Sequence, residues 1–247
     1  ANYNTGVGID IFAALTTGDN NTAVGYQALL VNTTGDYNSA VGARTLSANV
    51  GGARNVAVGY AALESNSSTN GGSYNVGVGF SALCVNQASS NVAIGYSAVG
   101  QQALQYNTTA ADNTAVGYSA LAVNTEGHSN IAIGNYAGDA ITTGDWNVGI
   151  GVFSLSSNQT ANANTAIGKD CLANCTGGEN TAVGYQALVG NTSAEANVAV
   201  GFETLHANQT GTYGTAVGYR ALKASTVSSN TAVGAFAGQA LTGANCV

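Results

Sequence analysis

The residue types that most often perform catalysis are scarce in this chain and are not grouped. Two histidines, His128 and His206, are the only imidazole bases, and neither has an acidic partner that recurs with it. A general base acts only on a group within hydrogen-bond reach. The sequence also lacks a nucleophile elbow, a Walker loop and any zinc-ligand spacing. It therefore predicts a protein that is not an enzyme and has no cofactor and no metal site.

The four cysteines, Cys84, Cys171, Cys175 and Cys246, form no Cys-x-x-Cys pair. Cys171 and Cys175 are close in sequence, and two interpretations stay open: they form a disulfide, or they are two buried free thiols. Cys246 could link the chain to a second subunit.

Three other patterns resemble ligand or modification sites. Glycine pairs such as Gly6 and Gly8 recur along the chain as part of a repeat, so we do not interpret them as phosphate loops. Gly-Asp turns such as Gly18-Asp19 recur irregularly and lack the glycine-rich pattern of calcium-binding β-rolls, which favours ordinary turns. Asn-x-Ser/Thr triplets are glycan acceptors in a eukaryotic secreted protein and plain turn residues in a prokaryotic or viral fibre. They begin at Asn32, Asn66, Asn107, Asn158, Asn174, Asn191 and Asn208.

A repeat of about seventeen residues accounts for most of the remaining sequence. The phrase Asn-Thr-Ala-Val-Gly-Tyr and its variants open fourteen units. Most spacings are 16 or 17 residues, and longer ones occur between Asn55 and Asn113. A fixed period of this length indicates one supersecondary element per unit, which buries its apolar face only by stacking on its neighbours. The units begin at residues 4, 21, 38, 55, 75, 91, 113, 130, 147, 164, 180, 197, 214 and 230.

Each position of the unit, counted from its opening residue as a column, has its own physical requirement. Column one is Asn in every unit except at Gly214, which indicates a bend where stacked amides can hydrogen-bond. Column three is Ala or Gly, column four is Val or Ile, and column five is always Gly. This alternation is typical of a strand, and a second, shorter strand is expected after the glycine. We expect ladders of like residues, for example Asn21, Asn38 and Asn55; Val24, Val41 and Val58; and Gly25, Gly42 and Gly59.

Two short strands and two turns in seventeen residues make one coil of a parallel β-solenoid. Because successive coils can pair like residues in register, the sequence predicts an all-β solenoid of about fourteen coils. Its thin core would consist of Val, Ile and Leu. No linker interrupts the repeat, so one domain is expected over residues 1–247.

The composition excludes several classes of partner. Five Lys plus Arg face twelve Asp plus Glu, a net charge of −7 without a basic stripe, which disfavours nucleic acid binding. No apolar run reaches the length of a membrane span, so the chain is not expected to be membrane-embedded. Aromatic residues after the column-five glycine form a discontinuous stripe, which favours packing, with carbohydrate or cell-surface contact as the alternative.

The phrases Asn-Thr-Ala-Val-Gly-Tyr and Asn-Val-Ala-Ile-Gly-Tyr resemble the head repeats of trimeric autotransporter adhesins and similar repeats of phage tail fibres. The resemblance covers the whole chain, although the unit here is longer than in the adhesins and no coiled-coil stalk or membrane anchor is visible. It implies a rigid extracellular, cell-surface or virion fibre.

We expect a non-catalytic structural subunit. No polar cap precedes the first unit or follows the last, so we expect rods that stack head to tail into a filament, or flanking domains beyond this sequence. The alternative is a trimeric adhesin head or tail-fibre segment, assembled through its small-residue face, that contacts cell-surface glycans or proteins. A minor alternative is ice binding through the column-two threonines, which Val or Ile interrupts in several units.

Overall fold

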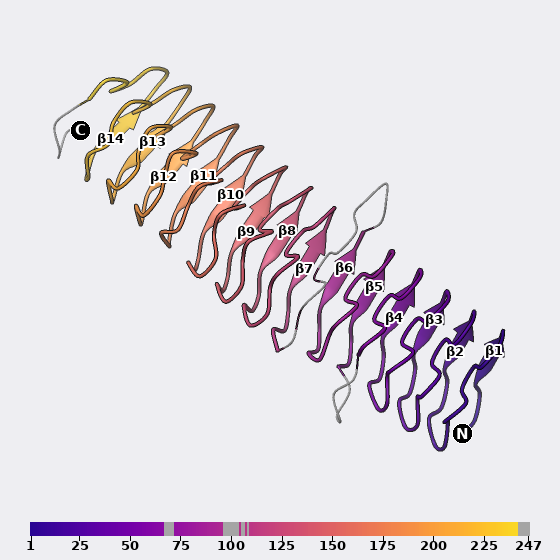
Figure 1. Cartoon of the computed structure of the whole chain (residues 1–247). Coiled ribbons are helices and arrows are strands. Elements are labelled where there is room, and N and C mark those ends of the chain that lie inside the picture. The colour runs from indigo at the N-terminus through magenta and orange to yellow at the C-terminus, as the bar shows by residue number, and fades with distance from the viewer. Residues whose placement is uncertain (67–71, 96–103, 105–106, 108, 242–247) are drawn as a thin grey trace. The chain divides into compact units, whose positions relative to one another are not determined.

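The computed structural model describes residues 1–66, 72–95, 104, 107 and 109–241 (Figure 1). It is an all-β parallel solenoid with roughly 17 residues per turn, and the described residues form no helix. Each repeat unit contributes one three-residue strand over columns two to four. The predicted fold class is therefore confirmed.

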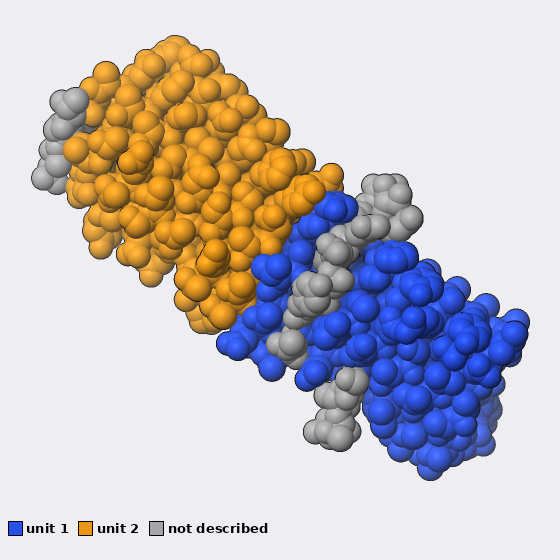
Figure 2. Space-filling model, in the orientation of Figure 1, with its two compact units in different colours: residues 1–128 blue, residues 129–247 orange. Residues whose placement is uncertain are grey.

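The chain divides into two compact units, residues 1–128 and 129–247, called unit 1 and unit 2 below (Figure 2). Whether they form a single domain over residues 1–247 stays a prediction. Unit 1 contains β1 (Thr5–Val7), β2 (Thr22–Val24), β3 (Ser39–Val41), β4 (Val56–Val58), β5 (Val76–Val78), β6 (Val92–Ile94) and β7 (Thr114–Val116). Unit 2 contains β8 (Ile131–Ile133), β9 (Val148–Ile150), β10 (Thr165–Ile167), β11 (Thr181–Val183), β12 (Val198–Val200), β13 (Thr215–Val217) and β14 (Thr231–Val233).

Within each unit, every strand pairs in parallel with the next, column on column. In unit 1, Val24 pairs with Val41 and Val41 with Val58, as the expected ladders require. In unit 2, Ala182 pairs with Ala199 and Ala199 with Ala216. Because like residues meet, each coil presents the same side chains at the same height.

The core differs from the prediction in one respect. Column-three alanines such as Ala23 and Leu residues such as Leu29 are fully buried, but the column-four residues face outward. Val24, Val41 and Val58 are 36%, 42% and 39% exposed. The expectation of a Val/Ile/Leu core is thus wrong for Val and Ile.

The limited width of the coil interior explains this orientation. At Gly77, in the middle of β5, an added Cβ would already lie 3.2 Å from Cγ of Leu63. In most coils one Leu therefore fills the interior opposite a small column-three residue. A strand alternates its side chains between two faces, so the β-branched residues on either side of column three must point outward.

The corner after each strand requires glycine. Gly25 has φ of 137°, and a Cβ there would lie 2.4 Å from the carbonyl oxygen of Gly42 in the next coil. The second strand expected after this corner is absent, because Gln27 and Leu29 have φ of 55° and 52°, which breaks an extended conformation. These residues form turns instead, and their N–H groups still donate to neighbouring coils.

Two longer coils keep the register of the repeat. Asn66 Nδ2 donates to Gly72 O at 2.8 Å across the extra residues of the first. In the second, Leu104 is fully buried and its N–H donates to Ala120 O. Insertions in the turns therefore leave the core positions in place.

Candidate functional site

The column-one asparagines form the predicted ladder. Asn38 donates to Oδ1 of Asn21 from its backbone N–H at 2.9 Å and from Nδ2 at 3.1 Å. Asn55 makes the same pair of bonds to Asn38. All three side chains are fully buried. This ladder satisfies polar groups at the bend before each strand, so its role is structural.

A second buried asparagine ladder was not predicted. In unit 1, Nδ2 of each ladder residue donates to Oδ1 of the one in the preceding coil at 2.9 to 3.0 Å. This second ladder consists of Asn32, Asn49, Asn66, Asn86 and Asn107. The sequence contained a signal for this ladder, because each member lies three residues after a core leucine. These leucines are Leu29, Leu46, Leu63, Leu83 and Leu104.

Burial also decides how the Asn-x-Ser/Thr triplets are interpreted. Six of the seven asparagines are buried, and only Asn174 is exposed. A buried amide cannot accept a glycan in the folded chain. The six triplets are therefore structural residues in this fold, although they match a modification motif.

Side chains two positions before several of the column-one residues form a third set of contacts between coils. Oδ1 of Asp36 accepts from the backbone N–H of Asp19 at 2.7 Å, and Nδ1 of His128 accepts from the N–H of Ala111 at 3.0 Å. We call these side chains the turn caps. They give the Gly-Asp turns and His128 a structural role.

The cysteines are free thiols. Cys171 Sγ donates to Ala182 O at 3.2 Å, and Cys175 Sγ donates to Gly177 O at 3.1 Å. Burial raises the pKa of Cys171 to about 12 and that of Cys175 to about 11. Such thiols are unreactive at neutral pH. Of the two interpretations, the structure has the buried free thiols and no disulfide; Cys246 lies outside the described residues.

Each of the five cationic side chains already has a partner. Arg44 pairs with Glu64 and Lys169 with Asp170. Arg220 and Lys223 both contact the carboxylate of Glu203. These contacts lower the pKa of that carboxyl, and the hydrogen bond from Lys223 is the largest cause. The fifth, Arg54, lies over the rings of Tyr37 and Tyr74. The cations are therefore spread among local contacts and form no continuous basic surface that could follow a phosphate backbone.

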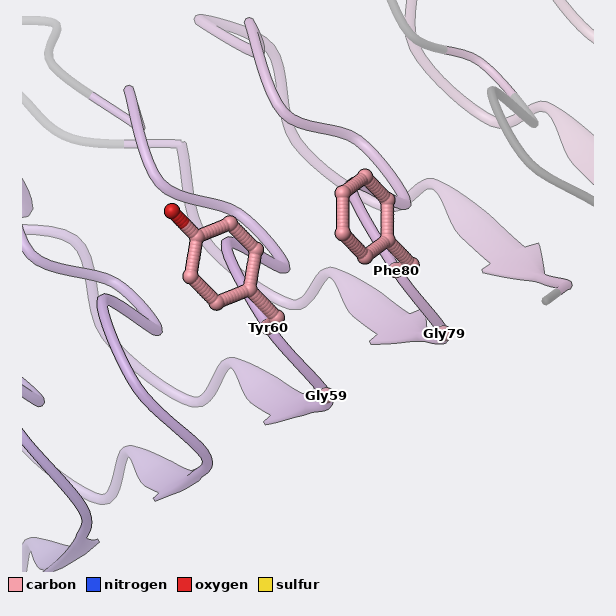
Figure 3. A pocket seen from close by; sticks show the side chains of 4 residues that line it. All are labelled: Gly59, Tyr60, Gly79 and Phe80. Carbon is pink, nitrogen blue, oxygen red and sulfur yellow. The ribbon is translucent and has the colours of Figure 1, made fainter.

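The aromatic stripe forms stacked pairs. The rings of Tyr60 and Phe80 lie 5.2 Å apart at 21°, beside an apolar hollow of about 280 Å³ that Gly59 and Gly79 also line (Figure 3). Tyr185, Phe202 and Tyr219 stack in the same way. Because these rings stack on one another, the faces that meet within each stack are not available to a sugar. These stacks favour the packing interpretation of the stripe.

The largest repeated surface feature is the outer face of the strands, which we call the sheet face. It consists of two rows of side chains, from columns two and four. Column four contributes only Val and Ile, and column two contributes exposed Val or Ile at Val56, Ile131 and Val198. A sheet with one solvated face normally alternates apolar and polar residues. The sheet face instead combines an unbroken Val/Ile row in column four with a column two that is Thr or Ser in eight units and Val or Ile in six. Its exposed apolar surface is therefore concentrated in the column-four row.

The described residues contain no group of three or more His, Cys, Asp or Glu side chains that could hold a metal ion. No helix among them is long and apolar enough to cross a membrane. The chain matches no family model, no curated protein and no solved structure.

Proposed function

We propose that the protein is a non-catalytic structural segment of an extracellular, cell-surface or virion fibre, and that further copies of the chain cover its sheet face. The observation that carries this proposal is the outward orientation of the column-four residues. Val24, Val41 and Val58 lie in register on consecutive strands and are each more than a third exposed. Exposed apolar patches of this regularity mark interaction surfaces.

A second copy is the partner that fits the sheet face best. A repeat surface is periodic along its own axis, so two copies can match their rows over many coils at once. The face has no charged residue in columns two and four, so association would bury no unpaired charge. Three copies around a common axis are the arrangement that the resemblance to trimeric adhesins implies.

The contact surface must differ from the one expected from the sequence. The small column-three residues, such as Ala23, Ala40 and Ala57, are buried inside the coil and cannot touch another chain. The trimer proposal therefore moves to the Val/Ile rows. Head-to-tail stacking into a filament stays a separate proposal, and electron micrographs of the native protein would test it by the distribution of particle lengths.

Ice binding is the second candidate for the same surface. Column-two threonines such as Thr22 and Thr165 lie on the sheet face beside the column-four row. Their row is interrupted by Val56, Val76 and Val92 in consecutive coils, which weakens a lattice match. A freezing-point depression below the melting point, measured on the native protein, would favour this candidate over self-association.

The experiment compares two variants by sedimentation equilibrium. The double variant Val41→Glu/Val58→Glu places two carboxylates on the sheet face. The control Val50→Glu changes a turn residue of equal exposure, 39% for both Val50 and Val58. We expect the native protein and the control to sediment as oligomers, and the double variant at the mass of one chain, 24.4 kDa.

Two outcomes would count against the proposal. One is a native protein that sediments as a single chain at high micromolar concentration. The other is a double variant that associates as strongly as Val50→Glu, which would locate the contact elsewhere. Circular dichroism of both variants ensures that a change in mass does not arise from unfolding.

A further inference from the structure

A hollow of about 260 Å³ lies on the turn side of unit 2, and we call it the notch. We propose that it binds a neutral or amino oligosaccharide, with the rings of Trp146 and Tyr213 on either side. Its lining residues include Thr160, Asn162, Thr176, Gly178, Glu179 and Glu195.

The notch lies at a turn that has no capping side chain. In the preceding coil, Oδ1 of Asn162 caps the N–H of Asp145 at 2.7 Å. The next coil is one residue shorter than the usual seventeen and has Gly178 at the capping position, with no side chain. A Cβ there would lie 2.9 Å from Asn162 O, so glycine allows this turn to lie close to the preceding coil, and residue 178 places no side chain in the hollow beside Asn162.

The lining offers hydrogen-bonding groups of both kinds. Oδ1 of Asn162 is used by Asp145, which leaves its amide N–H groups as donors. Thr176 Oγ1 donates to Thr192 O at 2.6 Å, which leaves its lone pairs as acceptors. Glu179 and Glu195 are exposed carboxylates, and no Lys or Arg lines the notch. Sugar hydroxyls can pair with all of these groups, an amino group would be favoured, and an acidic sugar would be repelled.

Aromatic side chains lie two coils to either side of Glu179, a lining residue of the notch, in the same column. The N–H of Ala163 donates to Asp145 O, beside Trp146, and the N–H of Tyr213 donates to Glu195 O at 3.3 Å. Trp146 and Tyr213 are 63% and 69% exposed. They occupy the same column four coils apart, roughly 19 Å at the usual strand spacing. That span suits a linear chain of several sugar units rather than a single ring.

The ring faces have only small neighbours toward the notch. The residue next to Trp146 in its column is Ala163, and the one next to Tyr213 is Ala196. In unit 1 the same column has Tyr37 and Tyr74 on either side of Arg54, whose guanidinium lies 5.4 and 5.3 Å from the two ring centroids. A pyranose needs a free ring face for its C–H surface. The faces of Trp146 and Tyr213 toward the notch have alanine as the neighbouring residue of their column, whereas Tyr37 has the guanidinium of Arg54 over its ring and provides the control.

The test uses the fluorescence of Trp146, the only tryptophan of the chain. The probes are hexamers of β-1,4-linked N-acetylglucosamine, glucosamine and, as the acidic control, galacturonic acid. We expect a saturable change of emission with the first two and none with the third. Loss of a stacking ring in Tyr213→Ala should weaken binding about tenfold. Tyr213→Phe should retain it, and Tyr37→Ala should bind like the native chain.

Several results would overturn the inference. They are the absence of a saturable change at millimolar saccharide, an equal response to the galacturonic acid hexamer, and equal losses in Tyr213→Ala and Tyr37→Ala. A response to oligolysine without a response to saccharides would also overturn it and assign the notch to basic peptides. Thermal melting of each variant separates lost binding from lost folding. The notch lies outside the strand columns that form the sheet face, so this result is independent of the proposed self-association.

Discussion

The second asparagine column behaves differently in the two units. In unit 1, Oδ1 of Asn32 accepts from Nδ2 of Asn49 in the next coil, and the pattern continues to Asn107. In unit 2, Oδ1 of Asn191 accepts instead from the N–H of Ala194 in its own turn at 2.8 Å. One residue type at one position thus either links coils or closes a turn.

Two sequence differences accompany the divergence. In unit 2 the column is interrupted by Ile141, Cys175 and Ser225. No asparagine of this column in unit 2 therefore has another asparagine on both of its sides. The turn residue also differs. In the turn of Asn49 it is Gly52, where a Cβ would lie 2.4 Å from Oδ1 of Asn49, whereas in the turn of Asn191 it is Ala194. The residue type alone does not decide, because Asn86 stays in the ladder beside Ala88, and Oδ1 of Asn208 accepts from the N–H of Gly211 in its own turn. The comparison teaches that an unbroken amide column favours links between coils, and that at Asn49 the ladder oxygen also leaves no room for a Cβ at residue 52.

We expect the largest difference in stability between the two units when one asparagine amide of this column is removed from each. Asn49→Ala leaves Oδ1 of Asn32 and one N–H of Asn66 buried without a partner, which should cost about 3 kcal/mol of unfolding free energy. Asn191→Ala should cost only about 1 kcal/mol, because Ala194 O keeps a bond from Asn180 and Ala194 N–H one to Gln209 O. Urea denaturation measures both values. Equal costs would mean that the ladder adds nothing beyond turn closure.

A pair of exchanges at the turn residue tests the need for space. Gly52→Ala should destabilise unit 1 by about 2 kcal/mol, since the new methyl group would crowd the ladder oxygen and Gly72 O. Ala194→Gly in unit 2 should cost less, about 1 kcal/mol of backbone entropy. Hydrogen exchange would show loss of protection in the coils of Asn32 and Asn66 for the first variant only. Protection that stays unchanged in those coils would rule out steric control of the ladder.

Restoring the column should make unit 2 more like unit 1. Cys175→Asn puts an amide between Asn158 and Asn191 in a coil of sixteen residues. Asn86 shows that such a coil accommodates the ladder, because its Nδ2 donates both to Ala88 O and to Asn66 Oδ1. We expect a gain of about 1 kcal/mol from the added hydrogen bonds. Cys175→Ala is the control, and a gain of the same size there would attribute the effect to loss of the thiol.

The smallest effect at neutral pH concerns Cys171, one of the two buried thiols of unit 2. Folding raises the pKa of Cys171 from 9.0 to about 12, chiefly through burial. The folded chain therefore keeps a proton that the unfolded chain releases, so stability is full below pH 9 and falls as the pH rises toward 12. Cys171→Ala, which introduces the usual column-eight residue, should reduce this fall between pH 8 and pH 10.5 in denaturation experiments. An identical pH dependence in the variant would contradict it.

Much of the fold was predictable from the repeat alone. The recurring Asn, Val and Gly columns predicted the parallel register, and the glycine corner at Gly25 followed from its recurrence. The expectation of a second strand was wrong. Gln27 and Leu29 adopt the left-handed conformation, which their residue types ordinarily avoid, so nothing in the residue types indicated it. The second asparagine ladder was readable from its spacing to the core leucine, but several of its members were considered only as glycan acceptors or plain turn residues.

The sequence by itself determined that like residues stack on like residues, because a fixed period leaves each coil only its neighbours to pair with. Tertiary structure alone decided which face of the strand points inward, since Val24 and Ala23 alternate equally well until Leu fills the interior. It also decided whether a buried amide links coils or closes its own turn. Tertiary structure also decided where the notch lies, because the effect of having no side chain at Gly178 depends on the neighbouring coil that lies against it.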